Sequence, residues 1–216
     1  MSCTIVTCDQ RSPEWFAARV GRLTASAAGD MLATVRSGEA AARRNLRTKL
    51  LLERLTGKVL DSGFTTRAMQ QGVEREPLAR AAYEALTGDL VVEVGFVQLD
   101  GVMAGCSPDG VFLDKDGRIV RGLELKAPEP TAHLDYYLTR TLPAHYRAQI
   151  VHSLWVTGAS RWEWMSYNPD FPEAMQTVML GVDRDEDEVA AYAEKALAFL
   201  AEVDDNERVV RERITK

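Results

Sequence analysis

Residues 90–126 read LVVEVGFVQLDGVMAGCSPDGVFLDKDGRIVRGLELK, and this stretch decides the fold class. Its short runs of β-branched and other apolar residues are typical of strands. Asp100-Gly101 and the segment 114–117 have the Asp-Gly chemistry of tight hairpin turns. The stretch therefore predicts an antiparallel β-meander, with strands over residues 90–99, 102–105, 110–113 and 118–125.

Helical patterns lie on both sides of this stretch. Ser12-Pro13 predicts the start of a short helix that delivers Arg19, because Ser is a good N-cap and Pro fits the first turn. Hydroxyl caps at 24–26 predict a second helix to about Thr34, which places Ser26 near a helix N-terminus, where an anion is favoured. Helices are also predicted over 39–55, 66–86 and 143–156 and from about 185, and strands over 161–167 and 176–182.

One predicted helix contains residues that interrupt helices. Gly72 and Pro77 predict a kink, or a break between two helices, near residues 74–77, because Pro removes a backbone donor and clashes with the preceding turn. The sequence shows no repeat, low-complexity tract or linker. We therefore expect one domain over residues 1–216, of the α/β class, in which helices flank a mixed central sheet and an acidic helix closes the chain from about 185.

Charge is distributed unevenly along the 216 residues, whose net charge is −6. Residues 183–205 hold nine acidic side chains against two basic ones, whereas residues 36–58 hold seven basic side chains against two acidic ones. The basic segment could meet a phosphate backbone, although a solvated helix face is the commoner fate of such a run. The overall negative charge therefore does not exclude a nucleic-acid partner.

The composition excludes several other classes of protein. With 46% hydrophobic and 27% charged residues, the chain can bury a sizeable core, and its apolar runs are too short to span a membrane. Cys3, Cys8 and Cys106 lack the spacing of a disulfide framework or a zinc site, so we expect reduced, mostly structural thiols. The N-terminus has no signal-peptide pattern, and we expect a cytoplasmic protein.

Residues suited to phosphodiester hydrolysis lie within the predicted strands. Asp109 follows Ser107-Pro108 at a bend, and 15 residues later Glu124 and Lys126 share one face of a strand, with the Leu125 carbonyl nearby. Carboxylate and carbonyl oxygens suit Mg²⁺, and a neighbouring Lys can orient or help to deprotonate an attacking water. The alternative for Glu124 and Lys126 alone is a solvent-facing strand pair.

Five motifs in order carry a family resemblance. They are Arg19–Ser26 (RVGRLTAS), Gly72–Glu76 (GVERE), Cys106–Gly110 (CSPDG), Leu123–Lys126 (LELK) and Tyr146–Gln149 (YRAQ) running on to Ser153–Thr157 (SLWVT). Together they resemble the lambda exonuclease family, the YqaJ-like viral recombinases, within the PD-(D/E)xK nuclease superfamily. The resemblance implies a restriction-endonuclease-like fold and a Mg²⁺ cofactor, with Mn²⁺ as a second choice.

The resemblance also implies roles for individual residues. It implies that Asp109, Glu124 and the Leu125 carbonyl bind the metal, that Lys126 serves the attacking water, and that Glu76 completes the acidic site, for which Glu74 is a rival. It implies that a pocket for a terminal 5′-phosphate consists of Arg19, Ser26, Ser107 and Gln149, and that Arg36 and Met69 reach the DNA. Taken singly, each residue has an ordinary alternative: an ion pair for Arg19, a turn hydroxyl for Ser107, core packing for Met69.

The activity that this resemblance implies is a 5′-to-3′ exonuclease. It would degrade one strand of linear double-stranded DNA to mononucleotides, as a homotrimer that cooperates with a single-strand annealing protein in phage-type recombination. Two alternatives stay open: a structure- or site-specific endonuclease of the same fold, and a non-catalytic DNA-end-binding scaffold. Loss of Asp109 or Lys126 would mark the scaffold, and both residues are present. His133, His145 and His152 lack metal-ligand spacing, and we expect His145 and His152 to pack or to meet solvent.

Overall fold

The computed structural model describes residues 2–60 and 67–214, without the side chains of residues 67–69 and 71. Its strands form two four-stranded mixed sheets. The first has the order β1-β3-β4-β2, from β1 (Cys3–Val6), β2 (Leu23–Thr24), β3 (Phe96–Leu99) and β4 (Ala104–Cys106). The second has the order β5-β6-β7-β8, from β5 (Gly110–Leu113), β6 (Ile119–Lys126), β7 (Arg161–Tyr167) and β8 (Thr177–Asp183).

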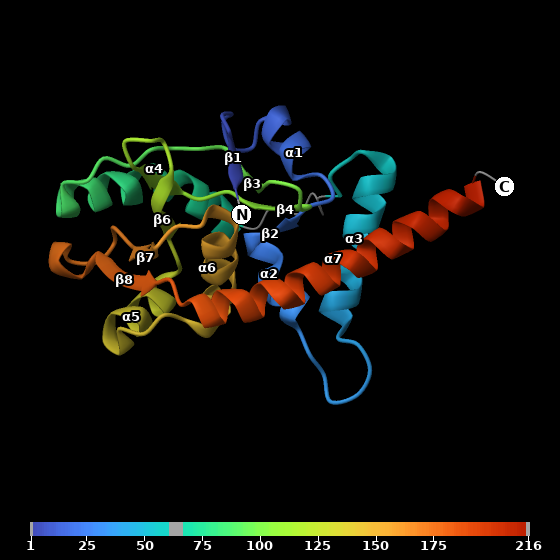
Figure 1. Ribbon diagram of the computed structural model, residues 1–216. Helices are drawn as coiled ribbons and strands as arrows, with labels where there is room; N and C mark the ends of the chain where they lie inside the picture. Colours follow the sequence, from blue (N-terminus) through green and yellow to red (C-terminus); the bar gives the residue numbers. More distant parts are fainter. Residues whose placement is uncertain (1, 61–66, 215–216) are drawn as a thin grey trace.

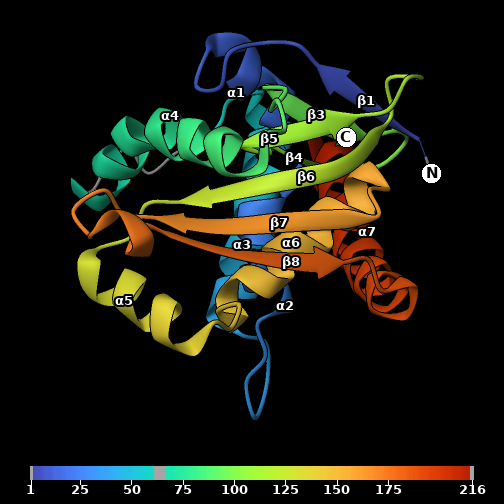
Figure 2. The same ribbon diagram turned by 90° about the vertical axis from the view of Figure 1, so that its left-hand side faces the viewer.

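Helices cover both faces of the second sheet, with α6, α2, α3 and α7 behind it in the view of Figure 2. On one face, Leu123 and Leu125 of β6 pack against Ala79 and Tyr83 of α4. The other face packs on α6 and α7 in the main core. The helices are α1 (Pro13–Arg19), α2 (Ala28–Leu32), α3 (Ala41–Thr56), α4 (Arg67–Thr87), α5 (Pro130–Thr139), α6 (Ala144–Thr157) and α7 (Glu186–Ile214), with short 3₁₀ turns at Ala25–Ala27 and Glu173–Met175.

The predicted α/β class with mixed strand directions and flanking helices is confirmed, but two four-stranded sheets replace the single central sheet that was predicted, and the predicted meander is divided between them. β3 pairs with β4 and β5 with β6, both antiparallel, around turns in which Gly101 and Gly117 have φ of 75° and 78°. Residues 90–95 form no strand and contribute an isolated bridge from Val92 to Val111. The bend at residues 107–109 therefore carries the chain from one sheet to the other.

Local signals located most helix ends, with some corrections. Ser12 caps α1 by accepting from the Trp15 amide at 3.2 Å, as the sequence predicts, and Gly57 and Gly158 end α3 and α6 with positive φ. The predicted break in α4 is wrong, because the helix continues through Pro77 and packs on β6 and β7. The predicted helix to Thr34 is a 3₁₀ turn and a short α2 that ends at Leu32, and no side chain caps either.

Neither β1 nor α5 was predicted from the sequence. β1 pairs antiparallel with β3, so its position depends on a strand more than 90 residues away. α5 begins with Pro130 in its first turn and ends at Arg140, which has a φ of 48°. The three cysteines are free, as predicted. Among the described helices, none has both the length and the apolar character that crossing a bilayer would require.

The basic segment on α3 and the acidic helix α7 neutralise each other. Arg43 and Arg47 both pair with Glu202, at 2.7 Å, and Arg54 pairs with Asp204 at 2.5 Å. Figure 1 shows α7 crossing α3 and continuing beyond it to the C-terminus. Much of the positive charge predicted to meet a phosphate backbone is therefore engaged within the protein.

Candidate active site

The bend between β4 and β5 is attached to β6 through Asp109. The Asp109 amide donates to the Leu123 carbonyl at 3.1 Å, and its carboxylate Oδ2 accepts from the Leu125 amide at 2.6 Å. Gly110 follows, and a Cβ there would lie 2.1 Å from the Val91 side chain, so any other residue would force Val91 to move. These contacts fix the Asp109 carboxylate beside the strand that carries Glu124 and Lys126.

Glu124 and Lys126 lie on the face of β6 that meets α6. The Lys126 ammonium donates to Glu124 Oε1, and Gln149 Nε2 of α6 donates to the same oxygen at 2.6 Å. The Lys126 nitrogen also lies 5.1 Å from the centre of the Tyr146 ring. Because the Glu124 side chain is only 5% exposed, this pair is not the solvent-facing strand pair that was its alternative.

Burial and like charge perturb the titration of this cluster. Burial, followed by the nearby Glu124 carboxylate, raises the pKa of Asp109 well above its ordinary value. For Lys126, burial lowers the pKa, but the Glu124 and Asp109 carboxylates outweigh it and hold the pKa above its usual value. Lys126 is therefore a protonated cation at neutral pH in this arrangement, placed to orient groups and to offset negative charge.

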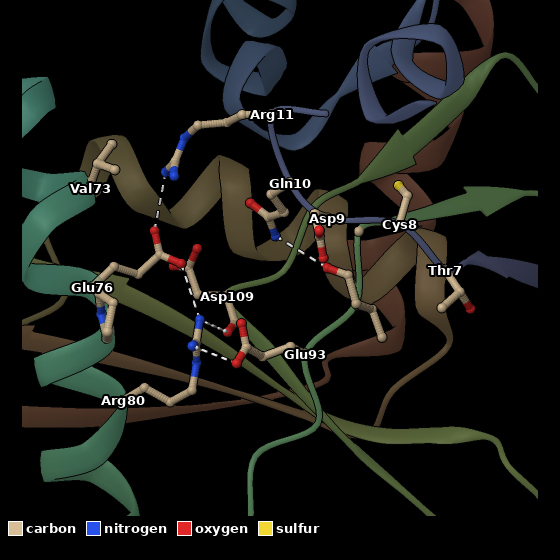
Figure 3. Close-up of a pocket in the computed structure, with 13 residues that line it drawn as sticks. Thr7, Cys8, Asp9, Gln10, Arg11, Val73, Glu76, Arg80, Glu93 and Asp109 are labelled. Carbon is tan, nitrogen blue, oxygen red and sulfur yellow. Dashed lines mark hydrogen bonds and ion pairs between the residues drawn. The ribbon is translucent and has the colours of Figure 1, made fainter. Parts of the chain in front are cut away.

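Glu76 lies where two cavities meet. One cavity, of about 610 Å³, is lined by the segment 7–11, by Glu93 and by Arg80, and the other, of about 410 Å³, is lined by Leu125, Lys126 and Tyr146. Both cavities include Glu76 and Asp109. Figure 3 shows the two carboxylates on the wall of the first cavity. The rival acid Glu74 is exposed and lines neither cavity.

Two arginines hold Glu76. Arg80 Nη2 lies 3.1 Å from Glu76 Oε1 and also donates to the Asp109 carbonyl at 3.3 Å, while Arg80 Nη1 pairs with Glu93 at 2.8 Å. Arg11 Nη2 lies 3.3 Å from Glu76 Oε2 (Figure 3). Arg80 thus ties the helix α4 to the bend at Asp109, and neither arginine was predicted as a site residue.

Ser107 and Arg19 meet at the other end of the bend. Arg19 Nη1 donates to Ser107 Oγ at 3.0 Å, and Trp15 Nε1 donates to the same oxygen at 2.8 Å. The Arg19 guanidinium stacks over the Trp15 ring at 4.1 Å. Gly21, with a φ of 65°, accepts from Arg54 Nε at 3.0 Å, which anchors the turn after α1. Trp15 was not predicted as a site residue.

The remaining predicted site residues are more scattered. Ser26 is exposed and its hydroxyl lies 3.3 Å from that of Thr24, whereas Gln149 bonds Glu124. Arg36 is exposed on the loop between α2 and α3, which projects from the body in Figure 1. Met69 falls in α4, but its side chain lies outside the described part of the structure. Within the predicted phosphate pocket, Arg19 and Ser107 are bonded to each other.

The donor atoms available here are hard oxygens. The hydrogen bonds described above use Oδ2 of Asp109 and Oε1 of Glu124. The second oxygen of each carboxylate takes no part in those bonds and could bind a cation. Within residues 2–60 and 67–214, no three His, Cys, Asp or Glu side chains are clustered tightly enough to form a ready metal-binding group. The histidines have other bonding partners. His152, for example, is buried and bonded to Tyr192 and the Gly105 carbonyl.

Solved exonuclease structures share the fold of this chain. The alkaline exonuclease LHK-Exo from Laribacter hongkongensis, solved alone and with dAMP, shares 32% identity and a TM-score of 0.83, over 94% of this chain and 98% of that one. A phage-related exonuclease from Haemophilus somnus 129PT shares the fold, with 12% identity and a TM-score of 0.67 over 89% of this chain and 96% of that one. No curated protein matches the chain significantly.

The fold and the sequence lead to the same family. The two mixed sheets with flanking helices form the restriction-endonuclease-like fold of the matching alkaline exonuclease. The model of the YqaJ-like viral recombinase domain matches residues 14–160, which contain α1, the bend, β6 and α6. The chain therefore belongs to the YqaJ-like viral recombinase family.

Proposed function

We propose that this protein is a Mg²⁺-dependent 5′-to-3′ exonuclease that degrades one strand of linear double-stranded DNA to mononucleotides and leaves a 3′ single-stranded tail for phage-type recombination. One observation carries the proposal. Ser107, bonded to Arg19 and Trp15, and Asp109, bonded to β6, are two residues apart on one bend. A group that binds a terminal phosphate and the groups that hydrolyse the next phosphodiester are thereby held at a fixed separation.

The residues present fit a divalent cation. Burial, followed by the nearby Glu124 carboxylate, raises the pKa of Asp109, and a cation bound beside the two carboxylates would favour their ionised forms. Asp109, Glu124 and the Leu125 carbonyl would hold Mg²⁺, with Glu76 completing the acidic set, since hard oxygens are its usual ligands. When bound, the cation would activate water and stabilise negative charge on the phosphate.

Lys126 and Gln149 both orient the Glu124 carboxylate. Because both donate to Oε1, that oxygen is fixed and the carboxylate cannot rotate freely. The protonated Lys126 also supplies a positive charge beside the phosphate that is attacked, which stabilises the additional negative charge of the transition state. Tyr146 lies against the ammonium and limits its movement.

The proposed pocket for the 5′-phosphate begins with Arg19 and Ser107. A guanidinium matches two phosphate oxygens, and stacking on Trp15 reduces the side-chain freedom that binding would otherwise cost. Ser26 and Gln149 complete the pocket in this proposal, with Arg36 and Met69 contacting the duplex. LHK-Exo, which shares this fold, has been solved in complex with dAMP, a nucleoside monophosphate.

A single gel tests the proposed function. Purified protein is incubated with 5′-phosphorylated linear duplex, 5′-hydroxyl linear duplex and covalently closed circles, in Mg²⁺, Mn²⁺ or EDTA. We expect rapid loss of the 5′-phosphorylated strand in Mg²⁺, slower loss of the 5′-hydroxyl strand, and no reaction in EDTA. Cutting of closed circles at the same rate would instead identify an endonuclease, and binding without digestion would identify a scaffold.

The assembly is a separate part of the proposal. By resemblance to the family, we propose a single nuclease domain that forms a homotrimer around DNA and works with a single-strand annealing protein. Light scattering coupled to size-exclusion chromatography measures the mass directly, against 24.0 kDa for one chain. A mass of one chain at micromolar concentration would contradict the trimer without affecting the catalytic proposal.

A further inference from the structure

Arg11 has an unfavourable backbone conformation for its residue type. Its φ is 71°, in the left-handed region that side chains with a Cβ rarely adopt, and Arg140 is the other non-glycine residue with positive φ in the described ranges. Arg11 precedes Ser12, whose amide donates to the Asp9 carbonyl at 3.1 Å in the turn before α1. Strain of this kind persists where the surrounding structure or the function requires it.

The strained turn directs Arg11 to the mouth of the 610 Å³ cavity. Figure 3 shows its side chain extending from the turn toward Glu76, with Val73 on the adjacent helix. Its Nη2 lies 3.3 Å from Glu76 Oε2, and half of the side chain is exposed. A guanidinium has five N–H donors, so this one ion pair uses only part of the hydrogen-bonding capacity of Arg11.

Glu76 does not depend on Arg11 for its position. Arg80 already pairs with Glu76 at 3.1 Å, and its side chain is only 14% exposed. Arg80 is fixed in turn by Glu93 and by the Asp109 carbonyl. A second arginine on the same carboxylate, held at the cost of backbone strain, therefore calls for another explanation.

The negative charge of the cavity offers an explanation for the second arginine on Glu76. Its lining includes four carboxylates, Asp9, Glu76, Glu93 and Asp109, which would repel a phosphodiester. Arg80 is enclosed by its three partners, so Arg11 is the more exposed of the two arginines that line this cavity. A DNA strand that reaches Glu76 and Asp109 through the 610 Å³ cavity would meet the Arg11 guanidinium at the mouth of that cavity.

We propose that Arg11 binds a backbone phosphate of the DNA strand next to the scissile phosphodiester, at the mouth of this cavity. The proposal rests on the nuclease function proposed above and adds a DNA-binding residue to it. Because Arg11 would contact DNA, its loss acts on affinity and on the salt dependence of binding. A residue that only positioned Glu76 would act on the rate of hydrolysis and leave the salt dependence unchanged.

The test compares Arg11→Gly with Arg140→Gly. Both changes remove an arginine from a left-handed position that glycine adopts without strain, but Arg140 ends α5 and stacks on Tyr137 at 4.4 Å. Binding of a 5′-phosphorylated duplex is followed by fluorescence anisotropy in EDTA, between 50 and 200 mM salt. Thermal melting of the free proteins and digestion in Mg²⁺ are measured in parallel.

We expect Arg11→Gly to bind about tenfold more weakly at low salt and to lower the slope of log affinity against log salt by about one. Its melting temperature should not fall. Arg140→Gly should bind and digest as the wild type does. Arg11→Gln, which keeps a non-glycine residue in the strained turn, should show the same loss of slope, so a melting effect of glycine cannot account for it.

Three results would overturn the inference. If Arg11→Gly binds DNA with the affinity and salt dependence of the wild type, Arg11 does not contact a phosphate. The proposed function would still stand, because the wild-type protein digests DNA. A lower rate of digestion with unchanged binding would assign Arg11 to the positioning of Glu76. Failure of the wild type itself to bind and digest would overturn the proposed function, and the inference with it.

Discussion

Two regions of this molecule bring opposite charges together, and they differ in the direction in which the pKa of a carboxyl group is shifted. Where α3 meets α7, Arg43 and Arg47 lower the pKa of Glu202, mainly through their hydrogen bonds. In the cleft, burial and Glu124 raise the pKa of Asp109. The first region has cations enough for its carboxylates, whereas the second has an excess of buried negative charge.

The direction of the pKa shift thus separates a structural ion-pair cluster from a binding site. A carboxylate whose pKa is lowered already has its partner, and it contributes to stability. A buried carboxylate whose pKa is raised destabilises the folded protein when it ionises, and a bound cation would offset that cost. The sequence makes the first region easy to notice, because α3 and α7 carry runs of charged residues. It does not mark the second region in this way, because Asp109 is a single acidic residue.

The largest expected effect is on hydrolysis, from the cleft. Lys126→Ala should lower the rate of digestion by about a hundredfold to a thousandfold, because the transition state loses a fixed cation and Glu124 loses one donor. Asp109→Ala should abolish digestion. Circular dichroism should show that both variants fold. Lys195→Ala, on the exposed side of α7, is the control and should digest at the wild-type rate; a Lys126 variant as active as this control would remove the assignment.

Arg19→Ala comes next and tests the end pocket. We expect digestion of 5′-phosphorylated ends to slow by about tenfold to a hundredfold, and that of 5′-hydroxyl ends to slow far less, because only the former use the guanidinium. The matched control is Arg147→Ala on α6, which loses an ion pair with Glu188. Equal slowing of the two kinds of end would show that Arg19 has no role in phosphate recognition.

Asp109→Asn should raise thermal stability by a few degrees, at about 2–4 °C for each kcal/mol in a chain of this size. A group with a raised pKa contributes stability that is present below its ordinary pKa and is lost as the pH rises through the raised value. The advantage of Asn should therefore be full at pH 8 and vanish toward pH 4. Asp183→Asn, exposed and paired with Arg161, is the control. A less stable Asn variant at pH 8 would contradict crowding of charge in the cleft.

The smallest effect is expected where α3 meets α7. Glu202→Gln should lower the free energy of unfolding by about 1 kcal/mol, since Glu202 is 41% exposed and such pairs are screened by solvent. The loss should shrink in 1 M salt, and digestion should be unchanged. Urea unfolding at low and high salt measures the loss of stability, and the gel assay measures digestion. Reduced digestion would mean that this surface supports the active site.

Local patterns in the sequence determined the elements and the central tripeptide. The period of a strand places Glu124 and Lys126 on one face, and capping residues such as Ser12, Gly57 and Gly158 mark helix ends, because these effects act within a few residues. The class of the fold and the order of the motifs followed from such patterns and from the family resemblance. Pro77 misled the prediction, since packing of α4 on the sheet outweighs one missing hydrogen bond.

Only the tertiary structure decided which distant residues meet. Arg19 reaches Ser107, Gln149 reaches Glu124, and Glu76 rather than Glu74 lies beside Asp109, because each contact depends on how separate helices pack on the two sheets. The fate of the basic segment likewise depended on α7, about 150 residues away. Charge counted along the chain shows how much is present, but its use depends on the partners that folding brings within a few ångströms.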